Sequence, residues 1–183
     1  MGFELILLLS FQIFYGYIFY EVGILITSFM TGIAIGSFMV ISFRINIKHP
    51  LIILQGAECG LTLFSLLLLV FFSNAHFLDW ADPLYIRLIF LFLLFLSGFF
   101  TGIEFPVAND LYLKGNAIQS SANESSVGKT VGLLYGLDLL GGWLGGVIGG
   151  LVILPILGFF KACIIFAAMK LSSTLLLLTF SKK

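Results

Sequence analysis

Charged residues are scarce in this sequence of 183 residues, since Asp, Glu, Lys and Arg together account for only 10% of it. Soluble globular domains contain about 25% charged residues. Here 60% of the residues are hydrophobic and the mean hydropathy is +1.16. This composition excludes an ordinary water-soluble domain. The net charge of zero and the scattered basic residues also argue against a nucleic-acid partner.

Cysteine and histidine are equally rare, with two residues of each. Cys59 and Cys163 lie inside apolar runs and form no CxxC or CxxCH spacing. His49 and His76 fall in polar segments at opposite ends of an apolar run, which is unsuited to paired ligation of a haem or a metal. We therefore expect no metal, no cofactor and no catalytic residues. The chain is predicted not to be an enzyme by itself, although a separate partner chain could carry catalysis.

What the sequence has in abundance is long apolar runs, each of about 20 residues and thus long enough to cross a bilayer as a helix. The runs are continuously apolar rather than alternating, which excludes a membrane β-barrel. We predict an all-α, polytopic integral membrane protein with a single transmembrane domain over residues 1–183. About six helices are expected, at 2–19, 23–42, 51–72, 84–105, 131–154 and 162–180, with a flexible or partly helical cytoplasmic loop at 107–130.

Basic residues near the ends of the runs predict the orientation, because Lys and Arg are retained on the cytoplasmic side. With both termini inside, six basic residues lie in the cytoplasm and two outside. The inner ones are Arg44, Lys48, Lys114, Lys129, Lys182 and Lys183, and the outer ones are Arg87 and Lys161. Both termini are therefore predicted to be cytoplasmic.

Four ionisable residues fall inside the predicted spans, where a charge costs several kcal/mol unless it is paired or hydrated. They are Glu58, Glu104, Asp138 and Lys170. Helical spacing places three of them on polar stripes that should face the bundle interior; these stripes are Gln55–Glu58–Thr62–Ser65, Ser97–Thr101–Glu104 and Cys163–Ala167–Lys170–Thr174. Two interpretations stay open. Either Lys170 neutralises Asp138 or Glu58 and locks helix packing, or the surplus acids form a site for a proton or a small cation.

The fifth predicted span carries overlapping GxxxG pairs, which let another helix approach almost to backbone contact. Its predicted helix-packing face, a glycine zipper, consists of Gly141, Gly142, Gly145, Gly146 and Gly149, on the same side as Tyr135 and Asp138. Pro155 and Gly158 should end this helix. A short repeat is also present, since FMTGI at 29–33 and FFTGI at 99–103 match at four of five positions.

Several motifs together resemble the membrane domain of bacterial spermidine-synthase-like multi-spanning membrane proteins. They are FQIFYGYIFY at 11–20, GILITSFMTGIAIGS at 23–37, GIEFPVA at 102–108, LYGLDLLGGWLGG at 134–146 and LPILG at 154–158. The resemblance implies a transporter-like fold, the size of half a major-facilitator-like bundle, in the bacterial cytoplasmic (inner) membrane. The soluble aminopropyltransferase domain of that family is missing from this sequence. Only Glu104 and Asp138 therefore carry over as motif residues, without a known role.

Two functions are compatible with these features. The first is a non-catalytic membrane subunit or scaffold, embedded in the lipid bilayer, that anchors or completes a larger complex with a hetero-oligomeric protein partner. The second is a transporter-like module for a proton or a small organic, polyamine-like cation, which would act as a homodimer because six spans make half of a major-facilitator-type transporter.

Overall fold

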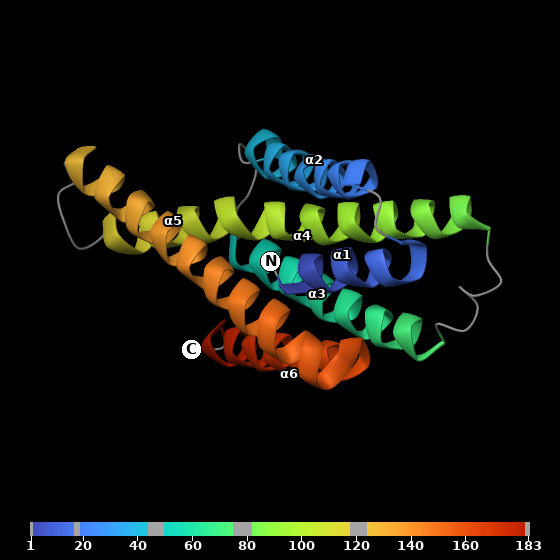
Figure 1. Ribbon diagram of the computed structural model, residues 1–183. Helices are drawn as coiled ribbons and strands as arrows, with labels where there is room; N and C mark the ends of the chain where they lie inside the picture. Colours follow the sequence, from blue (N-terminus) through green and yellow to red (C-terminus); the bar gives the residue numbers. More distant parts are fainter. Residues whose placement is uncertain (1, 17–18, 44–49, 75–81, 118–123, 182–183) are drawn as a thin grey trace.

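The computed structural model describes residues 2–16, 19–43, 50–74, 82–117 and 124–181, and these contain helices and no strand. The chain is drawn in Figure 1 from blue at the N-terminus to red at the C-terminus. Its elements are α1 (Gly2–Tyr15), α2 (Phe19–Phe43), α3 (Pro50–Ser73), α4 (Pro83–Ala117), α5 (Glu124–Gly146), the π-helical segment η3 (Val147–Ile153) and α6 (Leu154–Ser181).

Four helical segments of the described chain are long and apolar enough to cross a membrane, which confirms the prediction of an all-α protein with the helices of a membrane protein. They are Phe19–Ser42, Leu51–Ser73, Pro83–Leu111 and Tyr135–Leu177. The helix α1 is apolar but shorter, at 14 residues. It ends before the predicted residue 19 because Gly16 takes φ 100° and its N–H bonds the carbonyl oxygen of Gln12 at 3.1 Å. Glycine adopts this left-handed conformation without a steric penalty.

The 43-residue segment Tyr135–Leu177 contains a sharp bend at Gly158, where φ is 74°. In Figure 1 the chain turns back here, so that α6 returns along α3 while α5 crosses the bundle obliquely. The predicted stop at Pro155 and Gly158 therefore lies close to the observed turn, although α6 already begins at Leu154. The two runs predicted at 131–154 and 162–180 form two arms of one hairpin.

The predicted loop at 107–130 is largely helical, which corrects its boundaries. Helix α4 passes through Pro106 and continues to Ala117, and α5 begins at Glu124. Proline inside a helix of membrane-spanning length is tolerated because neighbouring groups satisfy the freed backbone carbonyl. Residues 118–123 lie outside the described residues, as do four basic residues used for the predicted orientation: Arg44, Lys48, Lys182 and Lys183.

Helix α4 occupies the centre of the bundle and packs against α1, α2 and α3. Its buried side chains include Phe90 and Leu94, both fully buried. Phe90 meets Phe11 of α1 edge-on, with ring centroids 5.4 Å apart. Phe11, Phe90 and their apolar neighbours thus form one phenylalanine-rich core between these helices.

The closest helix contact joins α2 and α4, which run in the same direction (Figure 1). We call it the glycine seam and define it by Gly32 and Gly36 of α2 and Gly98 and Gly102 of α4. A Cβ atom at any of these glycines would collide with backbone atoms of the partner helix. Two serines add bonds across the seam, because Ser28 donates to the Leu91 carbonyl and Ser37 to the Gly102 carbonyl, each at 2.9 Å.

Candidate functional site

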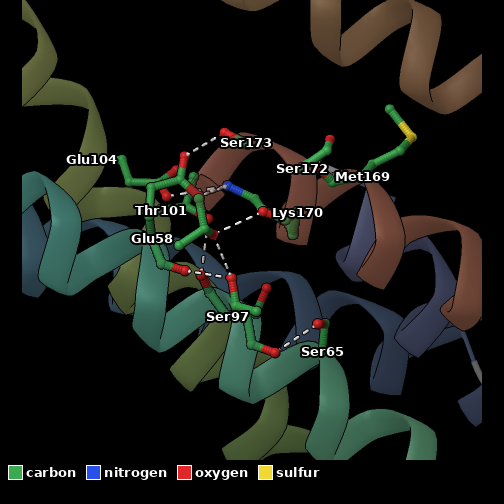
Figure 2. Close-up of polar contacts among 11 residues, drawn as sticks. Glu58, Ser65, Ser97, Thr101, Glu104, Met169, Lys170, Ser172 and Ser173 are labelled. Atoms are coloured by element: carbon green, nitrogen blue, oxygen red, sulfur yellow. Dashed lines mark hydrogen bonds and ion pairs between the residues drawn. The ribbon is translucent and has the colours of Figure 1, made fainter. Parts of the chain in front are cut away.

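Lys170 lies at the centre of a charged cluster formed by three helices. From α6 its Nζ atom is 3.2 Å from Oε2 of Glu58 on α3 and 3.2 Å from Oε1 of Glu104 on α4. Figure 2 shows the lysine extending between the two carboxylates. The side chains of Glu58, Glu104 and Lys170 are 11%, 22% and 25% exposed. The structure thus brings three of the four predicted intramembrane charges together.

The polar stripes explain why these residues meet. Glu58, Thr62 and Ser65 are all buried on one side of α3, as their spacing predicted. Hydroxyl groups complete the cluster, since Ser173 donates to Oε1 of Glu58 at 3.2 Å and the hydroxyls of Thr62 and Thr174 are 2.8 Å apart. The two stripes of α3 and α6 therefore form a continuous polar contact in an otherwise apolar bundle.

Asp138 of α5 faces this cluster without joining it. It lines two cavities, of about 360 and 560 Å³, and shares the lining of both with Thr101, Glu104 and Ser173. Within the described part of the chain, Asp138 forms no hydrogen bond or ion pair. The predicted pairing of Lys170 with Glu58 is thus present, and the alternative pairing with Asp138 is not.

The predicted packing face of α5 is only partly filled. A Cβ atom at Gly149 would lie 3.1 Å from the Phe166 ring, and one at Gly146 would lie 3.7 Å from Leu5. A Cβ atom at Gly141 or Gly145 would meet nothing within 4 Å. Gly142, between Gly141 and Gly145 in the sequence, is half-buried. The face therefore packs at its C-terminal end and is open toward Asp138.

The charges of this region do not balance. Glu58 and Glu104 carry two negative charges against one positive charge on Lys170, and Asp138 adds a further negative charge nearby. No group of three metal-ligating side chains occurs among the described residues. Chemically, such an arrangement can tie three helices together, and its surplus carboxylates can accept a proton or a cation.

The structure contains a second ion pair that was not predicted from the sequence. Nε of Arg87 at the start of α4 is 2.9 Å from Oε2 of Glu21 at the start of α2, whose side chain is 1% exposed. The two residues are separated by the same interval in sequence as Gly32 and Gly98. The repeat strings at 29–33 and 99–103 are offset by 70 residues, four more than this interval, so aligning them would not have paired Glu21 with Arg87.

No protein-family model, curated protein or solved structure matches the chain. Its class therefore rests on the fold and the site described above. The apolar helices define an all-α protein of membrane type, and a mixed-charge cluster joins three of its helices.

Proposed function

We propose that the chain is a non-catalytic integral membrane subunit that anchors or completes a larger membrane complex. The observation that carries this proposal is the use of Lys170, whose two ion pairs tie α3, α4 and α6 together. Ionisable groups within membrane spans commonly pair with one another, and in this proposal the two pairs of Lys170 serve to hold the three helices together. In this proposal the chain crosses the bacterial inner membrane six times, with both termini in the cytoplasm, and the alternating directions of α1 to α6 in Figure 1 support six passes.

The open part of α5 supports a protein partner. Gly141 has free space around it, and the neighbouring Leu140 and Trp143 are 57% and 63% exposed. Apolar side chains alone would be covered adequately by lipid, but a helix with small residues offers close approach to another helix. We place the contact with the partner on this side of α5.

The test is purification of the full chain from its native membrane in a mild detergent. A partner should be recovered in stoichiometric amount, lost in the Gly141→Leu variant and retained in the Gly132→Leu variant. Gly132 lies on the same helix with equally free space, so it controls for the substitution itself. A homodimer or monomer free of any companion would contradict the proposal.

A second candidate is favoured by Asp138 and its surroundings. The surplus carboxylates of Asp138 and Glu104 line shared cavities with hydroxyl groups, which supports a site for a proton or a small organic cation. In this alternative the chain is a transporter-like module that acts as a homodimer. The family resemblance adds a polyamine-like cation to the possible substrates.

Reconstituted vesicles separate this alternative from the first proposal. Proton uptake, followed by an internal pH dye, and uptake of a labelled alkyl-diamine should both be lost in Asp138→Asn and Glu104→Gln. Ser172→Ala is the matched control, because Ser172 is exposed on α6 and bonds only the nearby Met169 carbonyl. Uptake that is equal in all four proteins would remove the transport function.

A further inference from the structure

The two cavities beside the charged cluster adjoin, and they differ in character. The side chains that line both of them mark the place where they meet, and these are Thr101, Glu104, Asp138 and Ser173. The smaller cavity, of about 360 Å³, has further walls that the larger one lacks, formed by Phe3, Leu61, Ser97, Phe166, Met169 and Lys170. Most of these are apolar. The smaller cavity therefore has an acidic end and an apolar end, and we call it the amphipathic cavity.

One polar group of the amphipathic cavity has no partner. Ser97 lies two turns before Glu104 on α4 and is only 3% exposed. Its carbonyl oxygen accepts a bond from the Thr101 hydroxyl at 2.9 Å, but among the described residues its own hydroxyl forms no hydrogen bond. Buried serines in helices usually bond a carbonyl of the preceding turn, as Ser10 does with Ile6. Because an unpaired buried hydroxyl is unfavourable, Ser97 calls for a polar atom inside the cavity.

The acidic end of the cavity attracts a cation. The three carboxylates of Glu58, Glu104 and Asp138 face one ammonium group, that of Lys170, which is bound by both glutamates. Asp138 is left without an ion pair, and Glu104 lies beside it in both cavities. Ionised groups inside a membrane are costly unless they are paired or hydrated. A further cation is therefore favoured between Glu104 and Asp138, and it is not favoured at the apolar end, where no carboxylate lines the wall.

We propose that the amphipathic cavity binds a primary alkylamine that carries a hydroxyl group at its far end. The ammonium group lies between Glu104 and Asp138. The chain lies along Phe3 and Phe166, and the hydroxyl group bonds Ser97. Seven residues separate Ser97 from Glu104, which is about 10 Å along a helix. A chain of about five carbons, with a hydrogen bond at each end, covers this distance.

This ligand rests on the second candidate function, because it uses the same cation site. It replaces the diamine suggested by the family resemblance with an amine of single charge. The reason is the apolar end of the cavity, where a second ammonium group would lose its hydration and gain no counter-charge.

Isothermal titration of the full chain in lipid nanodiscs tests the ligand. The probes are aminopentanol, hexylamine and diaminopentane, unbranched amines with terminal functional groups and equal numbers of non-hydrogen atoms. They offer Ser97 a hydroxyl, a methyl or a second ammonium group. We expect aminopentanol to bind about fivefold more tightly than hexylamine, because it gains one neutral hydrogen bond. It should bind at least about tenfold more tightly than diaminopentane. Empty nanodiscs give the background from partition into lipid.

Three variants assign the two ends of the ligand. Ser97→Ala should lower the affinity for aminopentanol to that for hexylamine and leave hexylamine unchanged. The matched control is Ser10→Ala, because Ser10 is also buried in a helix but lines neither cavity; it should bind all three probes as the parent does. Asp138→Asn should weaken all three about tenfold, since it removes a carboxylate from the ammonium site.

The outcomes separate this ligand from the function on which it rests. Equal affinities for the three probes, tighter binding of diaminopentane, or an unchanged preference in Ser97→Ala would overturn the ligand and leave the cation site standing. Absence of binding by all three amines, or affinities unchanged in Asp138→Asn, would overturn the cation site as well. Binding without uptake in vesicles would support the ligand and contradict only transport. The ranking of the probes on the unmodified chain does not depend on the folding of any variant.

Discussion

Two helix faces of this protein are rich in glycine, and they differ in whether another helix packs closely against them. On the glycine seam, Gly32, Gly36, Gly98 and Gly102 bring α2 and α4 so close that any Cβ atom would collide with backbone atoms. On α5, Gly141 and Gly145 have nothing within 4 Å of their Cβ positions. The GxxxG pattern permits close approach, but by itself it does not determine whether a partner helix is present.

Polar groups account for the difference between the two faces. The seam is reinforced by the Glu21–Arg87 ion pair and by two serine hydroxyls bonded to backbone carbonyls across it. The α5 face carries Asp138, whose natural counter-charge on Lys170 is already engaged by Glu58 and Glu104. An ion-paired acid therefore accompanies the closed face, and an acid without an ion pair accompanies the open one.

The largest effect is expected from Gly98→Leu on the seam. The Cβ atom of the new side chain would collide with the backbone oxygen of Phe29. Protein interiors are close-packed and cannot accommodate such an overlap. We therefore expect α2 to separate from α4 and the helix packing to be lost. Yield of monodisperse protein in detergent measures the effect. Gly136→Leu on α5, with nothing within 4 Å, is the matched control and should purify normally. Similar yields for both variants would remove the distinction between the faces.

The next effect concerns the charges on the wall opposite α5. Lys170→Met leaves the Glu58 and Glu104 carboxylates buried near each other without a counter-charge. Loss of one partner from a buried ion pair costs about 3 kcal/mol or more of unfolding free energy. Unfolding by SDS in mixed micelles measures this loss.

A charge-free variant distinguishes a structural clamp from a binding site. Glu58→Met, Glu104→Met and Lys170→Met combined should recover most of the lost stability, because an apolar replacement of a whole buried ion network is often neutral. If the triple variant remains as unstable as Lys170→Met, the ion network is not what the single substitution disrupts.

The two faces also show what sequence patterns can and cannot predict. Apolar runs predict the helices because a helix that crosses the bilayer needs a minimum apolar length. Helical spacing also correctly placed Glu58, Thr62 and Ser65 on one buried stripe. The seam was missed, although both of its GxxxG pairs overlap the repeated strings at 29–33 and 99–103. Spacing within one helix says which residues share a face, whereas the neighbour of that face depends on the path of the whole chain. For the same reason Lys170 could be placed inside the bundle, but its choice of Glu104 over Asp138 could not be predicted.

A smaller effect tests the hydroxyl contribution to the seam. Ser37→Ala removes the bond to the Gly102 carbonyl, which is 2.9 Å long and only partly buried. Hydrogen bonds between helices in membranes contribute about 0.6 kcal/mol on average. The same SDS titration should therefore show a modest loss for Ser37→Ala and none for Thr27→Ala, since Thr27 bonds a carbonyl of its own helix. Equal losses would indicate that the hydrogen bond across the seam contributes no more stability than one within a single helix.

The smallest expected effect is that of a Gly→Ala substitution on the unfolding free energy. This effect should have opposite signs on the two faces, so it tests the comparison most directly. Gly141→Ala on α5 adds a methyl group where nothing lies within 4 Å, and alanine favours a helix over glycine by about 0.5–1 kcal/mol. We expect a slight gain in unfolding free energy at this position. Gly36→Ala on the seam gains the same helix propensity, but its methyl group would collide with the Phe99 carbonyl, so the net result should be a loss. A gain at both positions would mean that α2 and α4 yield without cost. A loss at both would mean that the α5 face is packed in the membrane, as the proposed partner requires.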